Sequence, residues 1–169
     1  LGMPVTTPTA CAIKSVRSPG SRQCGCIVDP LGDHAALCRR GRGFYRMHGA
    51  LARLTAHFAR EAEAEATLEV VVPELLKGEP GADDAVEARI DLHVWATAPA
   101  PMDAYLDFTA RHPCAARYTA EASKKEGATA AAAENEKRAR YGDGSGGVQV
   151  TPAAVESFGR FGADFDKFL

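Results

Sequence analysis

The sequence lacks several features that would place it in a special class of protein. It has no apolar stretch long enough to cross a membrane and no signal-peptide pattern of charge, apolar run and small-residue cleavage site, so we expect no membrane partner. It shows no internal repeat, and nothing in it resembles a motif that reads base edges in a DNA groove. It also lacks an initiating methionine, so we expect a fragment of a longer protein.

The composition is that of one ordinary folded domain. The chain has 169 residues, of which 46% are hydrophobic and 25% are charged, enough for a single substantial core. Its net charge of −2 conceals an asymmetry, because the first 50 residues hold seven basic side chains against Asp29 and Asp33. A basic leading third is typical of a phosphate-binding face, although clustered arginines are also common on plain solvated surface. The seven are Lys14, Arg17, Arg22, Arg39, Arg40, Arg42 and Arg46.

Five cysteines are present, and three of them lie within fifteen residues with a histidine among them. This pattern favours a metal over disulfides and an intracellular, reducing compartment. Three thiolates and an imidazole form the ligand set that tetrahedral Zn²⁺ prefers, with a structural role when all four positions are filled by protein. The alternative is buried cysteines beside a loop histidine. The predicted ligands are Cys24, Cys26, His34 and Cys38; since the Cys-x-Cys spacing is unusual, Cys11 or His48 could replace one of them.

The chain divides into three parts. Residues 1–23 hold scattered Pro, Ser and Thr and are predicted to form an extended lead-in, residues 24–43 form a zinc knuckle, and residues 44–169 form the folded core. The core begins with a predicted amphipathic helix that runs to about residue 66, because four apolar residues recur at helical spacing: Met47, Leu51, Leu54 and Phe58.

Strands are predicted next. Thr67 to Val72 is β-branched and apolar, and Lys77 to Asp84 is predicted to form a loop. Alternating polar and apolar residues then predict a hairpin that places Asp91 and Asp107 on the polar faces of adjacent antiparallel strands. Two such carboxylates can share Mg²⁺, which neutralises the charge that builds up when a phosphodiester is hydrolysed. The alternative is two solvated aspartates.

The Ala-rich run from about Ala120 to Arg140 has the highest helix propensity in the chain. Within it, Glu134, Lys137 and Tyr141 fall at i, i+3 and i+7, which predicts a helix face that presents a carboxylate, an ammonium and a phenol together. The alternative is a helical ion pair with solvated ends.

The end of the chain completes the predicted fold. A short strand is expected at Val148 to Val150, followed by a helix that starts at Thr151-Pro152 with Thr as N-cap. The order helix, strand, hairpin, helix, strand, helix predicts an α/β domain with a mixed sheet flanked by helices.

The motifs together resemble the restriction-like endonuclease domain at the C-terminal end of site-specific non-LTR retrotransposon polyproteins. The resemblance covers the whole chain in the family's order, with Ile90 in place of proline, Thr109 where nucleases of the PD-(D/E)xK type often carry lysine, and Arg140 in place of a second lysine. The matching segments are Leu1 to Pro4, Cys24 to Cys38, Arg46 to His48, Arg89 to Asp91, Asp107 to Thr109, Lys137 to Tyr141 and Val155 to Gly162.

The resemblance implies a PD-(D/E)xK core behind a structural zinc knuckle, and a Mg²⁺- or Mn²⁺-dependent endonuclease. Such an enzyme nicks nuclear target DNA and exposes a 3′-hydroxyl on which reverse transcriptase primes copying of the element's RNA. Asp91 and Asp107 would be metal ligands, Lys137 would orient or activate the water, and Tyr141 would help position the substrate. Glu134 would be a helper, and Arg39, Arg40, Arg42, Arg46 and Arg140 would contact nucleic acid.

The expected partners are therefore DNA, the reverse transcriptase and DNA-binding domains of the same polyprotein, and the element RNA. Two rival hypotheses remain. One is a catalytically inactive nucleic-acid-binding platform of the same fold, which the Thr at position 109 favours. The other is a zinc-stabilised domain that docks onto a protein or an RNA through its basic leading third.

Overall fold

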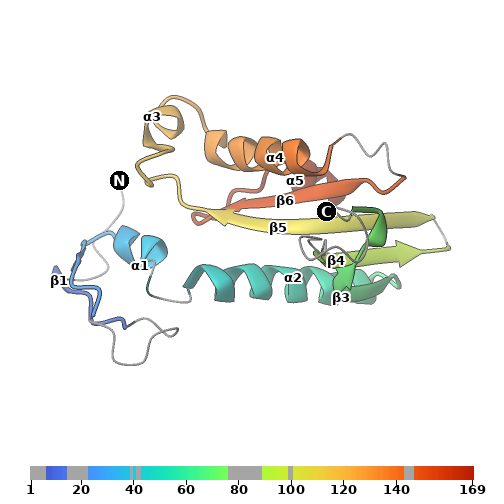
Figure 1. The fold of residues 1–169 in the computed structure, drawn as a ribbon, viewed down its shortest axis with the longest axis horizontal. Coiled ribbons are helices and arrows are strands. Elements are labelled where there is room, and N and C mark those ends of the chain that lie inside the picture. Colours follow the sequence, from blue (N-terminus) through green and yellow to red (C-terminus); the bar gives the residue numbers. More distant parts are fainter. Residues whose placement is uncertain are drawn as a thin grey trace, which may run out of the picture.

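The structure is a computed structural model that describes residues 7–14, 23–38, 40, 43–75, 89–98, 101–142 and 147–169. It is a mixed α/β fold (Figure 1). The strands are β1 (Thr9–Ala10), β2 (Ile27–Val28), β3 (Glu65–Val71), β4 (Arg89–Ala96), β5 (Met102–Arg111) and β6 (Val150–Glu156). The helices are α1 (Asp33–Leu37), α2 (Gly43–Glu61), the 3-10 turn η1 (Pro73–Leu75), α3 (Thr119–Ala122), α4 (Ala128–Tyr141) and α5 (Ala163–Phe168).

Four strands form one mixed sheet in the order β3-β4-β5-β6. The first three are antiparallel neighbours, and the predicted hairpin is confirmed, with Leu92 of β4 opposite Leu106 of β5. β6 pairs with β5 in parallel, which requires a crossover; α3 and α4 lie in it. The predicted mixed sheet with flanking helices is therefore confirmed.

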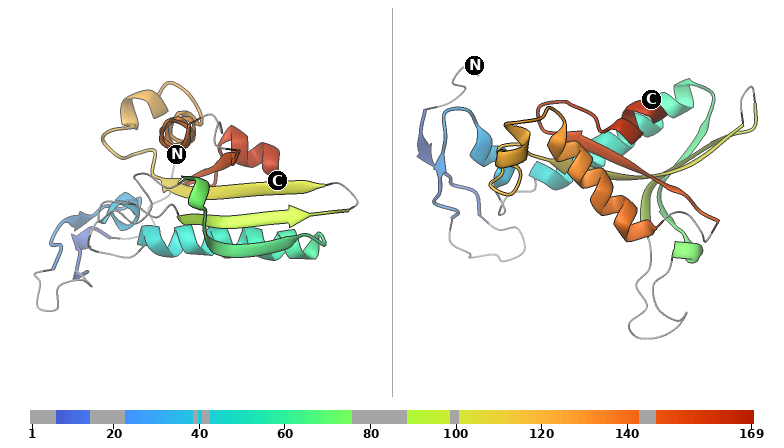
Figure 2. Two further views of the ribbon diagram at one scale, coloured as in Figure 1. Left: turned by 45° about the vertical axis from the view of Figure 1, so that its right-hand side comes forward. Right: turned by 90° about the horizontal axis from the view of Figure 1, so that it is seen from above.

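The helices lie on two sides of this sheet, as the view from above shows (Figure 2). α2 and α5 pack on the face that carries the apolar residues of the hairpin, and α4 packs on the other face, where Ala130 and Ala133 contact Ala154 of β6. α4 therefore covers the polar side of β5, so that Asp107 and Thr109 are buried.

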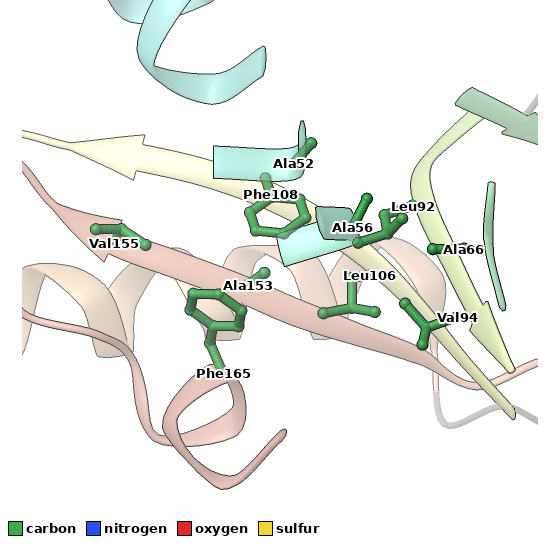
Figure 3. Close-up of a cluster of buried hydrophobic side chains, with 10 residues drawn as sticks. All are labelled: Ala52, Ala56, Ala66, Leu92, Val94, Leu106, Phe108, Ala153, Val155 and Phe165. Atoms are coloured by element: carbon green, nitrogen blue, oxygen red, sulfur yellow. The ribbon is translucent and has the colours of Figure 1, made fainter. Parts of the chain in front are cut away.

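The main core lies between the sheet and the α2–α5 side (Figure 3). Phe165 of α5 contacts Phe108 of β5 edge-on, with ring centroids 5.4 Å apart. Such aromatic pairs add to the stability that comes from the apolar area they bury. The cluster comprises Ala52, Ala56, Ala66, Leu92, Val94, Leu106, Phe108, Ala153, Val155 and Phe165.

α2 turns a different face to the sheet from the one predicted. Ala52, Thr55 and Ala56 are buried, whereas Leu54 and Phe58 are 51% and 57% exposed. Small side chains allow the helix backbone to approach the sheet, so the buried row is the alanine row. The predicted apolar stripe is wrong at its last two positions.

The expectation that Thr151-Pro152 starts a helix is also wrong. Both residues lie inside β6, where Pro152 pairs with Asp107. Proline is tolerated there because β6 is the edge strand of the four-stranded sheet, where a residue need not donate a backbone hydrogen bond to a further strand. Residues 152–156 are buried without alternation, which is typical of a strand that helices cover on both faces.

The predicted helix from Ala120 to Arg140 is divided into α3 and α4. Gly127, just before α4, has a φ of 73°, a left-handed conformation that glycine adopts without strain. The predicted loop from Lys77 to Asp84 lies outside the described residues.

The N-terminal segment contains little regular structure. β1 and β2 pair as a two-residue antiparallel ladder, so part of the predicted lead-in joins the knuckle. The carboxylate of Asp29 accepts hydrogen bonds from the backbone N–H groups of Leu31, Asp33 and His34, which fixes the start of α1. In the part of the chain that the structure describes, no helix is long and apolar enough to span a membrane.

Candidate functional site

Asp91 and Asp107 lie side by side where β4 and β5 separate. The hairpin pairing ends at Leu92 and Leu106, which directly follow Asp91 and directly precede Asp107 in the sequence. Beyond that pair, Oδ2 of Asp91 accepts a hydrogen bond from the backbone N–H of Phe108 at 2.7 Å. A side chain thus takes the place of a ladder bond and holds the Asp91 carboxylate next to Asp107.

α4 brings Lys137 and Tyr141 to the same place. Nζ of Lys137 lies 2.6 Å from Oδ2 of Asp107, and the Tyr141 hydroxyl donates to the same oxygen. The two residues are four apart on a helix, so they share a face. Burial and the contact with Asp107 raise the pKa of Tyr141, which keeps the phenol protonated as a donor. The structure therefore brings together the predicted Asp91, Asp107, Lys137 and Tyr141.

His48 of α2 completes the cluster, and it was considered at first only as a zinc ligand. Its Nε2 lies 3.0 Å from Oδ2 of Asp91. His48, Asp91 and Asp107 each offer a ligand atom within 4.8 Å of the other two. The signal that could have identified His48 is its helical spacing of four and seven residues from Ala52 and Thr55, on the face that packs against the sheet.

The two carboxyl groups have opposite pKa shifts. Burial raises the pKa of Asp107, and contacts with Lys137 and Tyr141 offset this only in part. Burial acts on Asp91 as well, but hydrogen bonds with His48, the Asp107 carboxyl and the Phe108 N–H outweigh it and lower the pKa. The pKa of His48 is raised, chiefly by its hydrogen bond to Asp91. Closely spaced carboxyls of this kind are a mark of functional sites, because a bound cation stabilises both as anions.

Glu134 does not join this cluster, so its predicted place on the face of Lys137 and Tyr141 is wrong. Its carboxylate points to the start of α5, where Oε1 accepts a hydrogen bond from the backbone N–H of Asp164 at 2.8 Å. Oε2 lies 3.5 Å from the guanidinium of Arg138. Glu134 lies three residues, about 4.5 Å along the helix axis, before Lys137, so its carboxylate meets the start of α5 rather than Asp107.

A cavity of about 200 Å³ opens beside the cluster. Thr109 lines it together with His48 and Arg111. Tyr45, 69% exposed, stands at its wall, as does Ala110. This cavity is the approach by which a ligand could reach His48 from solvent.

A second candidate centre lies in the N-terminal segment. Cys11, Cys24, His34 and Cys38 each place one ligand atom within 4.8 Å of all the others. The Cys11 and Cys38 sulfurs are 3.8 Å apart, and Sγ of Cys24 is 3.6 Å from Nε2 of His34. A hydrogen bond from the backbone of Cys26 is the main cause that lowers the pKa of Cys24 to about 7, which favours the thiolate that a metal binds.

In this group Cys11 takes the place predicted for Cys26. Cys26 is exposed, because Gly25 has a φ of 73° and turns the chain between Cys24 and Cys26. Cys11 is 4% exposed, and its backbone N–H donates to the carbonyl of Cys26. Cys11 was one of the two alternatives that the sequence left open.

The predicted nucleic-acid contacts can be placed only in part. Arg40, Arg46 and Arg140 are exposed, and the Arg140 guanidinium lies over the Tyr141 ring, 5.3 Å from its centroid. Arg39 and Arg42 lie outside the described residues.

Comparison with protein-family models, with curated proteins and with solved structures finds no match to this chain. Its function must therefore be inferred from the residues and their geometry.

Proposed function

We propose that this chain is a metal-dependent DNA endonuclease with a PD-(D/E)xK-like core. The single observation that carries the proposal is the convergence of Asp91, Asp107 and Lys137 from β4, β5 and α4, with His48 of α2 against Asp91. An acid on each of two adjacent strands and a lysine against the second acid form the set of groups that such a reaction needs.

The donor set fits a divalent cation. Asp91 and Asp107 would hold it through carboxylate oxygens, the ligands that Mg²⁺ and Mn²⁺ prefer. When bound, the cation supplies charge neutralisation at the scissile phosphate and a more acidic water. The imidazole of His48 makes the set softer than an all-oxygen one, so we expect Mn²⁺ to support cleavage at least as well as Mg²⁺.

The remaining groups position water and phosphate. Lys137 is held against Asp107 by a 2.6 Å contact, so its ammonium is fixed where it can orient the attacking water through another of its N–H groups. Tyr141 keeps Asp107 in place by donating to the same oxygen. Cleavage that leaves the phosphate on the 5′ end of the downstream fragment exposes a 3′-hydroxyl on the upstream fragment. This hydroxyl is the end that a polymerase extends.

A structural zinc site belongs to the same proposal. Three sulfurs and one imidazole nitrogen within 4.8 Å of one another match a closed tetrahedral zinc set, with Cys11 as the fourth ligand. Zinc there would fix α1, which leads into α2 and hence to His48.

The biological setting is proposed on the motif resemblance alone. The nuclease would nick nuclear target DNA for reverse transcription of a non-LTR retrotransposon, next to the reverse transcriptase and DNA-binding domains of one polyprotein. Because phosphate contacts carry no base information, we expect sequence-tolerant cleavage by this chain.

Nicking of supercoiled plasmid in Mg²⁺ or Mn²⁺ tests the proposal. Asp91→Asn, Asp107→Asn and Lys137→Ala are each expected to lower the nicking rate by roughly a hundredfold or more, since loss of groups around a catalytic metal commonly costs that much. Asp103→Asn is the matched control, because Asp103 lies on β5 but pairs with His93 at the exposed end of the hairpin. Activity that survives both Asp91→Asn and Asp107→Asn would contradict the proposal.

One observation favours a second function, the inactive binding platform. His48 lies 3.0 Å from Asp91 and can satisfy that carboxylate without a cation. A platform would bind DNA with the same salt dependence as a nuclease, but no divalent cation would produce nicks. The same plasmid assay therefore separates the two functions.

A further inference from the structure

A third group of metal-ligating side chains lies apart from both centres. It consists of Asp33 at the start of α1, His112 just after β5, and Cys114 two residues further on. Each offers one ligand atom within 4.8 Å of the other two. The predicted nuclease site uses none of them, and neither does the cluster around Cys24.

His112 is built into this group more firmly than a surface histidine would be. It is only 3% exposed, and Nε2 lies 3.0 Å from Oδ1 of Asp33. The other ring nitrogen, Nδ1, is hydrogen-bonded to the hydroxyl of Ser157, and the Phe158 ring packs edge-on against the imidazole. A histidine that presents one nitrogen to a ligand while the other is held by a hydrogen bond is the arrangement usual at metal centres.

The third member adds a soft ligand to this pair. Cys114 places its sulfur within 4.8 Å of the ligand atoms of Asp33 and His112. The set of one carboxylate oxygen, one imidazole nitrogen and one sulfur suits Zn²⁺.

We propose that Asp33, His112 and Cys114 bind a second zinc ion, with one coordination position left to solvent. The carboxylate of Asp29 does not fill that position, because its oxygens already accept the backbone N–H groups of residues 31, 33 and 34. Cys114 is exposed, so water reaches the site. The ion would fasten α1 to the end of β5, and thus the knuckle to the sheet.

Zinc content of the purified chain after gel filtration tests this directly. The intact protein is expected to retain two zinc ions per chain, and Cys114→Ser is expected to retain one. His93→Asn is the matched control: His93 pairs with Asp103 at 2.7 Å, and no third ligand is grouped with them among the described residues, so two ions should remain.

Alkylation of the intact protein tests, without any variant, whether zinc is bound at Cys114. With zinc present, Cys114 is expected to react with iodoacetamide at least tenfold more slowly than after zinc removal, as followed residue by residue by mass spectrometry. Cys26, which is exposed and outside both groups, is the internal comparison and should react readily in the zinc-loaded protein, in which Cys114 is protected.

Equal alkylation rates for Cys114 with and without zinc would overturn the proposal, as would a Cys114→Ser protein with the same zinc content as the intact chain. Protection of Cys24 in the same samples shows separately whether the first zinc site is occupied, and the nicking assay is not involved. Failure of the second zinc site is therefore distinguishable from failure of the first and of the nuclease proposal.

Discussion

The cluster around Cys24 and the pair Asp91–Asp107 differ in what holds their ligands in place. The cysteine cluster is drawn from a segment whose strands have two residues each and whose helix has five. The aspartate pair is held by strands of eight and ten residues, and its partners come from helices of fourteen and nineteen. The first region has few backbone bonds and little core, whereas the second has a full sheet ladder.

This difference separates two uses of a metal. Where regular structure is sparse, a bound ion supplies the folding free energy, so the knuckle should exist only with zinc. Where the ladder and core already fix the ligands, the ion adds chemistry without being needed for the fold. Removal of zinc should therefore unfold the knuckle, whereas removal of Mg²⁺ or Mn²⁺ should leave the fold unchanged.

Zinc removal is expected to produce the largest effect. Structural zinc contributes on the order of 10 kcal/mol in small domains, so Cys24→Ser or chelation should unfold residues 7–38 while the sheet persists. Hydrogen exchange would show rapid exchange in the N-terminal segment and unchanged protection in β4 and β5. Slow hydrogen exchange in the N-terminal segment after zinc removal would contradict the proposed dependence of this segment on zinc.

Phe165→Ala tests the core beneath the sheet that holds Asp91 and Asp107. Phe165 is 2% exposed and contacts Phe108, so its truncation should lower the free energy of unfolding of the core by about 3–5 kcal/mol. Phe58→Ala is the matched control, because Phe58 is 57% exposed and should cost roughly 0.5 kcal/mol or less. Urea unfolding measures both, and bound zinc should be the same in the two variants.

Tyr141→Phe tests the hydrogen bond to Asp107 with the ring retained. We expect the nicking rate to fall about tenfold, since a positioning hydrogen bond to a charged group contributes roughly 1.5 kcal/mol. Phe fills the same space, so the unfolding midpoint should fall only by the amount that the lost hydrogen bond accounts for. Tyr45→Phe on the cavity wall serves as the comparison, and an equal loss in both variants would argue against a specific role for Tyr141.

The smallest predicted effect concerns pH. The pKa of His48 is raised above 6.5 by its hydrogen bond to Asp91, so the folded state holds this proton more tightly than the unfolded chain. The resulting stabilisation is fully present below about pH 6.5 and is lost as pH rises through the higher folded-state pKa. His48 is 37% exposed, so screening reduces the contribution to about 0.5 kcal/mol.

Unfolding of zinc-loaded protein in the absence of Mg²⁺ and Mn²⁺ measures this effect. The difference in stability between the intact chain and His48→Gln should shrink as pH is raised from 6 to 9. A difference in stability that grows over that pH range would contradict the raised pKa assigned to His48.

The sequence predicted the hairpin and its two aspartates because a strand's side chains alternate strictly between two faces. The positions of Asp91 and Asp107 followed from that period once one apolar face was recognised. Lys137 and Tyr141 were found because a spacing of four on a helix is equally strict.

Three features could not be predicted, and each depends on contacts distant in sequence. β6 contains a Thr-Pro pair that locally favours a helix start, and only its edge position in the sheet makes a strand there favourable. The choice of Cys11 over Cys26 depends on the two-residue ladder between β1 and β2. The position of His48 depends on which face of α2 packs against the sheet. Ala52 and Ala56 lie on that face, whereas Leu54 and Phe58 were expected there.

Binding of Mn²⁺ to the zinc-loaded chain, followed by electron paramagnetic resonance, tests the central claim most directly. Asp91 and Asp107 should bind one Mn²⁺ in the intact protein. Binding should be lost in Asp91→Asn and Asp107→Asn and retained in Asp103→Asn. Mn²⁺ bound equally well by all four proteins, or by none of them, would contradict the assignment of this pair as the catalytic metal centre.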